Sequence, residues 1–133
     1  MISDSLRYRK IKKTKRSDEY LGIPAHEVCR YIEILFTEGM SWSNHGDWHF
    51  DHIIPVSSVQ TLPHDSEQFI RVFHFTNLQP IWKRQNLVKN DRQIPELIDE
   101  SNRRYRIWNE THDLDFLISQ LKNQTNLDQQ PVF

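Results

Sequence analysis

Apolar residues recur at helical spacing in several stretches of the chain. Between residues 24 and 36, Val28, Ile32, Leu35 and Phe36 fall at intervals of three or four, which is the pattern of one helix face. Pro24 stands before this stripe, where proline suits a first helical turn. The same reasoning predicts helices over residues 65–73, 82–90, 95–108 and 113–121.

Two short segments predict β-strands instead. Residues 48–55, WHFDHIIP, are rich in aromatic and branched side chains and end at a proline, and residues 77–81 form a second such run. The predicted fold class is therefore α+β: a small two-stranded antiparallel hairpin plus a helix, packed with additional α-helices.

Composition narrows the class of protein. A chain of 133 residues fits one compact domain. Its single cysteine leaves no internal disulfide and no paired-cysteine zinc site, so we expect no structural zinc. Three glycines leave no room for a glycine-rich phosphate loop. No apolar run has the length of a membrane span or a signal peptide, so we expect a cytoplasmic protein with no membrane partner.

Charge is concentrated at the N-terminus. The first seventeen residues hold one acidic residue and seven cations, namely Arg7, Arg9, Lys10, Lys12, Lys13, Lys15 and Arg16, whereas the rest of the chain is mildly acidic. A basic arm on such a body is typical of a protein that contacts nucleic-acid phosphates. A solvated tail and a localisation signal are the alternatives.

Four polar residues lie on consecutive predicted elements. Asp51 and His52 belong to the first strand, Asn77 begins the second, and Asn86 follows nine residues later on the next helix. A carboxylate beside a histidine offers a hard oxygen ligand next to a base whose reference pKa lies near neutral pH. Carboxylate and amide oxygens together suit Mg²⁺, which keeps several waters and takes few protein ligands.

Two longer segments carry a family resemblance. The stretch GMSWSNHGDWHFDHIIPVSS, followed by FHFTNLQPIWKRQNLVKND, resembles the HNH endonucleases, the ββα-metal or His-Me finger family, in its phage and intron-associated homing-type branch. The resemblance covers residues 20–91. It divides the chain into a basic arm (1–19), an HNH core with its preceding helix (20–91) and a C-terminal helical extension with a polar tail (92–133).

The resemblance implies a role for each motif residue. The position of His52 is the general base that activates water, and the position of Asp51 is a metal ligand. Asn77 is expected to brace the loop after the first strand and so to orient His52. Asn86 stands where the third letter of the motif is histidine, and it serves as the second metal ligand. The implied cofactor is a divalent cation, Mg²⁺ first, with Mn²⁺ or another divalent ion as alternatives.

Further polar residues lie beside the motif. Lys83, Arg84 and Lys89 flank Asn86, so they are candidates for phosphate contacts, with a solvated helix face as the alternative. Two further candidates complete the set: His49, which lies two positions before Asp51 and either reaches a phosphate or caps the hairpin, and Asn90, one turn after Asn86.

The remaining aromatic residues and histidines are given structural interpretations. Five aromatic residues are assigned to the core rather than to base stacking, because a small fold without disulfide or zinc needs their bulk: Trp42, Trp48, Phe50, Phe75 and Trp82. His74 is interpreted as structural. The histidines without a spacing argument are interpreted as surface or capping residues: His26, His45, His64 and His112.

The combined interpretation is a metal-dependent endonuclease that hydrolyses phosphodiester bonds of double-stranded DNA by in-line attack and leaves a 5′ phosphate. Its contacts are expected on the phosphate backbone, with weak sequence selectivity. The alternative is a nucleic-acid-binding module that keeps the HNH scaffold without turnover. The sequence leaves open whether the protein forms a homodimer. The predicted C-terminal helices match no known motif.

Overall fold

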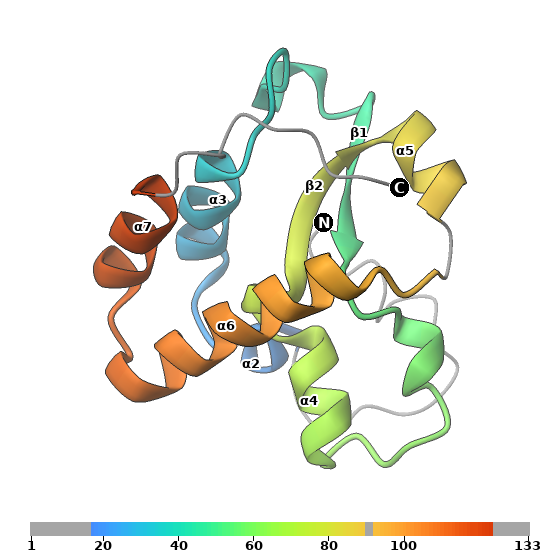
Figure 1. The fold of residues 1–133 in the computed structure, drawn as a ribbon, viewed down its shortest axis with the longest axis vertical. Helices are drawn as coiled ribbons and strands as arrows, with labels where there is room; N and C mark the ends of the chain where they lie inside the picture. Colours follow the sequence, from blue (N-terminus) through green and yellow to red (C-terminus); the bar gives the residue numbers. More distant parts are fainter. Residues whose placement is uncertain (1–16, 90–91, 124–133) are drawn as a thin grey trace.

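The computed structural model describes residues 17–89 and 92–123. This part of the chain contains six α-helices and two β-strands (Figure 1). In chain order they are α2 (Ser17–Leu21), α3 (Ala25–Ile34), β1 (Trp48–His52), α4 (Glu67–Phe73), β2 (Leu78–Trp82), α5 (Lys83–Lys89), α6 (Pro95–Thr111) and α7 (Leu114–Lys122). Short 3₁₀ turns cover Trp42–Asn44, Val56–Ser58 and Phe75–Asn77.

A two-stranded antiparallel sheet among α-helices agrees with the predicted α+β class. β1 and β2 pair antiparallel, with Trp48 opposite Trp82 at one end and His52 opposite Leu78 at the other. The connection between them is no tight turn, because it contains α4. Pro80 is tolerated within β2 because both strands of a two-stranded sheet are edge strands.

The strands are shorter than, or shifted from, the sequence prediction. β1 ends at His52 and does not continue to Pro55. The Ile53 amide still donates to the main-chain oxygen of Asn77 at 2.9 Å, but the main-chain groups of Ile54 bond the Asn77 side chain and not a partner strand. Asn77 itself lies in a 3₁₀ turn, so β2 begins one residue later than expected. His52, the last residue of β1, and Asn77, in the 3₁₀ turn before β2, therefore lie on the two sides of this junction.

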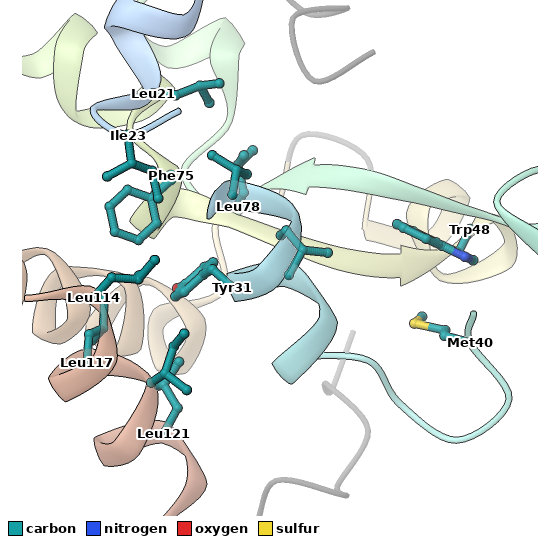
Figure 2. Close-up of a cluster of buried hydrophobic side chains, with 13 residues drawn as sticks. Leu21, Ile23, Tyr31, Met40, Trp48, Phe75, Leu78, Leu114, Leu117 and Leu121 are labelled. Atoms are coloured by element: carbon teal, nitrogen blue, oxygen red, sulfur yellow. The ribbon is translucent and has the colours of Figure 1, made fainter. Parts of the chain in front are cut away.

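One face of the sheet packs on the main hydrophobic core. Alternation along a strand places Trp48 and, on the partner strand, Leu78 on this face, where both are fully buried. Figure 2 shows Tyr31 of α3 gathered with leucines of α7 on this side of the sheet, while Trp48 lies at the far end of the strands beside Met40. The core assignment of the aromatic residues is confirmed: Trp48 and Phe75 are buried, and Trp42, Phe50 and Trp82 pack against the cluster.

Helix α5 lies along the opposite side of the hairpin and contacts both strands (Figure 1). A second cluster, formed by Tyr20 of α2 with Phe69 and Phe73 of α4, fills the space near the end of β1. Helix α4 lies within the helix predicted over residues 65–73, and Ser66 caps it, since its hydroxyl accepts a hydrogen bond from the Phe69 amide at 3.3 Å.

Helix α6 crosses the molecule between the 3₁₀ turn before β2 and the C-terminal helix α7. It packs against the 3₁₀ turn Phe75–Asn77 and against α7. Proline at its first position suits the helix start, and His112, in a left-handed conformation, ends it. The Asp113 carboxylate then caps α7. Within residues 17–89 and 92–123, no helix is long and apolar enough to cross a membrane.

Candidate active site

Asp51 is a buried carboxylate on β1 that faces α5. Its side chain is 8% exposed, and register places it directly opposite Gln79 of β2. The Gln79 amide donates to Oδ2 at 2.9 Å, and the Lys89 ammonium lies 3.3 Å from Oδ1 and from Oδ2. Burial raises the pKa of Asp51, although Lys89 and Gln79 both act to lower it. The carboxylate is therefore held in place by a neutral donor and a cation.

Lys89 is the last residue of α5, and the structure places it away from the surface. Only 1% of its side chain is exposed, and its ammonium also donates to the main-chain oxygen of His52 at 3.2 Å. A buried ammonium requires such partners, because transfer of an unpaired charge out of water is strongly unfavourable. The expected phosphate contact of Lys89 is thus replaced by contacts with two consecutive residues of β1.

His52 is the last residue of β1. Successive strand residues point to opposite faces, so its side chain and that of Asp51 leave the strand in opposite directions. The imidazole packs against Phe73 of α4, with 5.3 Å between ring centroids. Burial, and then the charge of Lys89, lower the pKa of His52 to about 4. The imidazole is therefore neutral near pH 7, which is the form that can accept a proton.

Asn77 is fully buried and braces the loop after β1, as expected. Its Oδ1 accepts from the Ile54 amide at 3.0 Å, and its Nδ2 donates to the Ile54 oxygen at 3.1 Å and to the Val72 oxygen at 2.8 Å. One amide thus bonds both main-chain groups of a residue two positions after His52. This side chain therefore fixes the conformation of the loop that follows His52.

Helix α5 carries the other candidates. Asn86 is half-buried on this helix, and Lys83 and Arg84 are exposed. His49 is half-buried, and its pKa is lowered by burial and then by the charges of Lys83 and His45. Asn90 and the seven cations of the N-terminal arm lie outside the described residues.

The side chains near Asp51 can be compared with the ligands that a divalent cation needs. No group of three or more His, Cys, Asp or Glu side chains converges in the part of the chain that the structure describes. The site offers one buried carboxylate, Asp51, and Asn86 supplies an amide on α5, the helix that contacts both strands. The Lys89 ammonium lies against both oxygens of this carboxylate, so a divalent cation would share Asp51 with it. Such a set fits Mg²⁺, which needs few protein ligands, and does not fit a closed zinc site.

Three residues near the site were not found from the sequence. Gln79 meets Asp51 only through the strand register. Ser101 of α6 reaches the 3₁₀ turn Phe75–Asn77, and Arg71 of α4 bonds Ser101; a serine or arginine within an amphipathic helix carries no signal of such a contact. The spacing of three residues between Asn86 and Lys89, one helical turn, could have indicated that they share a face.

The other histidines agree with their interpretation in all but one case. His26 is exposed on α3, His45 follows the 3₁₀ turn Trp42–Asn44, and His112 ends α6. His74 is structural: it is buried and bonded to Thr76. The surface assignment of His64 was wrong, because its side chain is 5% exposed and its ring stacks on Phe69 at 4.4 Å between centroids.

Comparisons with known proteins reveal similarity to viral sequences. The chain is 37% identical over 95 residues to "Uncharacterized protein L426" of Acanthamoeba polyphaga mimivirus, covering 68% of this chain and 41% of that protein. It is 30% identical over 95 residues to "Uncharacterized protein L246" of the same virus, covering 71% of this chain and 41% of that protein. The chain thus spans about two fifths of the length of these curated relatives. No protein family model matches the chain, and no solved structure matches it.

Proposed function

We propose that this protein is a metal-dependent endonuclease of the HNH type that hydrolyses phosphodiester bonds of double-stranded DNA. The observation that carries the proposal is the pair of hydrogen bonds between the Asn77 side chain and the main chain of Ile54, one accepted and one donated by Asn77, which holds the loop after His52 as a positioning amide should. In this proposal β1, β2 and α5 act as the two strands and helix of a ββα-metal unit. DNA as substrate also implies an intracellular place of action.

His52 is the general base in the proposed reaction. Its imidazole is neutral near pH 7 because burial and Lys89 lower its pKa to about 4. A neutral ring can remove a proton from the water that attacks phosphorus in line with the leaving 3′ oxygen. The proton moves to the imidazole, the bond from phosphorus to the 3′ oxygen breaks, and the phosphate stays on the 5′ side.

Asp51 and Asn86 would hold the divalent cation, most suitably Mg²⁺. When bound, the cation supplies charge stabilisation at the scissile phosphate and the leaving oxygen. Because Asp51 and His52 leave β1 in opposite directions, the proposal requires the scissile phosphate to lie at the end of the strand, where both side chains can approach it.

The DNA contacts of the proposal lie on α5 and on the N-terminal arm. Lys83 and Arg84 are exposed on the helix that carries Asn86, so phosphates beside the scissile bond are within their reach in the proposed complex. Contacts of this kind set position and affinity without sequence readout.

A plasmid cleavage assay tests the proposed function. The native chain should nick or linearise supercoiled plasmid with Mg²⁺ or Mn²⁺ and should fail to do so with a chelator. His52→Ala should lose on the order of 10² to 10⁴ in rate while still binding DNA. His26→Ala, which changes an exposed histidine of α3, is the matched control and should cleave as the native chain does. Cleavage that survives both chelation and His52→Ala would contradict the mechanism.

The ion pair between Lys89 and Asp51 favours one second candidate, a DNA-binding module without turnover. With an ammonium at the carboxylate, the site already has the cation that a buried Asp51 needs. Retardation of the plasmid without cleavage in Mg²⁺, Mn²⁺, Co²⁺ and Ni²⁺ would support this candidate in place of the endonuclease.

A further inference from the structure

Ser101 connects the C-terminal extension to the candidate active site. It lies near the middle of α6 and is fully buried. Its hydroxyl lies 2.9 Å from Oδ1 of Asn77 and 3.2 Å from the main-chain oxygen of Thr76. Both of these atoms are acceptors, so the single hydroxyl hydrogen is directed at the 3₁₀ turn that contains Asn77.

Arg71 fixes the direction of that hydrogen. Its guanidinium donates to the Ser101 oxygen at 2.7 Å, and a guanidinium has no acceptor to offer in return. The serine must therefore accept from Arg71 and donate toward Asn77. Arg71 is itself held by the Asn102 side-chain oxygen at 2.9 Å and by the Tyr105 ring, whose centroid lies 4.5 Å from the guanidinium carbon.

The orientation of the Asn77 amide follows from these contacts. Its oxygen takes two donors, the Ser101 hydroxyl and the Ile54 amide, and its nitrogen donates to two carbonyl oxygens, those of Ile54 and Val72. Rotation of the amide by half a turn would set donors against donors and acceptors against acceptors, at a site without exposure to water. The chain of contacts runs from α4 through α6 to the loop that follows His52.

We propose that Ser101, with Arg71 behind it, is a positioning residue for the general base His52, acting through Asn77 and Ile54. This inference rests on the proposed function and gives α6 a role in it. Ser101 does not touch the reacting atoms. Ser101 orients the Asn77 amide, and that amide fixes the loop after His52. Loss of the Ser101 hydroxyl should therefore change the orientation of the imidazole and leave substrate binding unchanged.

The test compares Ser101→Ala with Ser119→Ala. Both changes delete a helical serine hydroxyl, but that of Ser119 is exposed on α7 and bonds only within its own helix, to the Phe116 oxygen at 2.6 Å. Two quantities are measured: kcat and KM for plasmid nicking, well below the melting temperature, and the hydrogen-exchange rate of the Ile54 amide relative to core amides of α3.

Ser101→Ala is expected to lower kcat on the order of tenfold with little change in KM, and to speed exchange of the Ile54 amide by a similar factor. Ser119→Ala should change neither quantity. The proposal is overturned if Ser101→Ala lowers the melting temperature but leaves kcat and the relative exchange of Ile54 as in the native chain.

Arg71→Met, which keeps Ser101 and frees its hydroxyl to rotate, provides the same test if Ser101→Ala does not fold. Arg71→Met should speed exchange of the Ile54 amide more than Asn102→Ala does, because Asn102→Ala removes only one partner of Arg71. Equal exchange rates in these two variants would overturn the proposal. If the native chain cleaves no DNA, the proposed function is wrong, and the proposed effect of Ser101 on catalysis is wrong with it. Slower or unchanged Ile54 exchange in Ser101→Ala would refute the positioning contact separately.

Discussion

The Lys89 ammonium lies 3.3 Å from both carboxylate oxygens of Asp51, and neither side chain has appreciable contact with solvent. The same ammonium donates to the His52 oxygen, so one cation touches the backbone and the side chain of consecutive strand residues. Any divalent ion that binds Asp51 shares the carboxylate with this ammonium. Lys89 is therefore a structural counter-ion and, in the proposed function, a competitor of the metal for Asp51.

Lys89→Met should weaken the fold without metal and increase the response to metal. Removal of one partner of a buried ion pair costs about 3 to 5 kcal/mol, because the other charge stays buried. A divalent cation can then compensate Asp51 without competition, so Mg²⁺ or Mn²⁺ should raise the melting temperature of Lys89→Met by more than that of the native chain. Lys83→Met, an exposed change on the same helix, is the control. Equal metal-induced shifts in the native chain and Lys89→Met would contradict the competition.

The coupling of the pair can be measured by a double-mutant cycle. Asp51→Asn keeps the shape of the side chain and leaves Lys89 as the unpaired charge, so it should also be destabilised. The double variant Asp51→Asn/Lys89→Met has no buried charge at this position, so it should be more stable than either single variant. Urea unfolding with a chelator present gives the four free energies. Additive losses would mean that the two charges do not stabilise one another.

Local signals predicted much of the fold. The stripe of apolar residues in α3 and the helices α4 and α7 are found where the sequence predicts them, because each depends on residues within a few turns of one another. The bracing amide of Asn77 was also foreseen, through a resemblance that fixes the order of the motif residues. Chain order and short spacing were sufficient for these features.

The partners of the site residues depend on tertiary packing and could not be predicted in the same way. Gln79 meets Asp51 through a register set across the long connection that contains α4. In the sequence Lys89 cannot be told apart from the other cations of α5, and it is buried only because α5 packs on the sheet. Ser101 reaches Asn77 only because α6 crosses the 3₁₀ turn.

Asn77→Ala should be among the most destabilising single changes near the site. It removes a fully buried amide, leaves two main-chain oxygens and one main-chain amide without their partner, and opens a small cavity. Each unsatisfied buried group costs about 1 to 3 kcal/mol, so a loss of several kcal/mol is expected. Asn102→Ala, an exposed asparagine of α6, is the matched control. Denaturant midpoints for the two variants that lie close together would contradict the bracing role.

Stability should fall as the solution is acidified, and His74 should contribute to the fall. Burial first, then the charges of Arg71 and His112, lower the pKa of His74 to about 3, whereas an unfolded histidine titrates near 6.5. Because the folded pKa is the lower one, the unfolded state binds more protons, and stability is lost as pH falls from about 6.5 toward 3. One such histidine contributes at most about 1.4 kcal/mol per pH unit.

His74→Asn tests this contribution, because asparagine retains an acceptor for the Thr76 amide that His74 caps. The variant should show a shallower dependence of unfolding free energy on pH between 6.5 and 4.5, measured by urea unfolding at several pH values in that range. The control is His26→Asn, in which an exposed histidine is changed. Parallel pH profiles for His74→Asn and the native chain would show that His74 does not link protonation to folding.

Salt dependence can test the DNA contacts of α5 independently of cleavage. Each cation that neutralises a phosphate releases counterions, so log K falls with log salt by about 0.9 for each contact on duplex DNA. In a His52→Ala background, the double change Lys83→Gln/Arg84→Gln should therefore weaken binding and reduce the slope by about 2. Arg106→Gln, which alters an exposed cation of α6, should leave the slope unchanged because α6 is not in the proposed interface. An unchanged slope in the double variant, with a reduced slope in Arg106→Gln, would indicate that DNA binds at α6 and not at α5, the helix that carries Asn86.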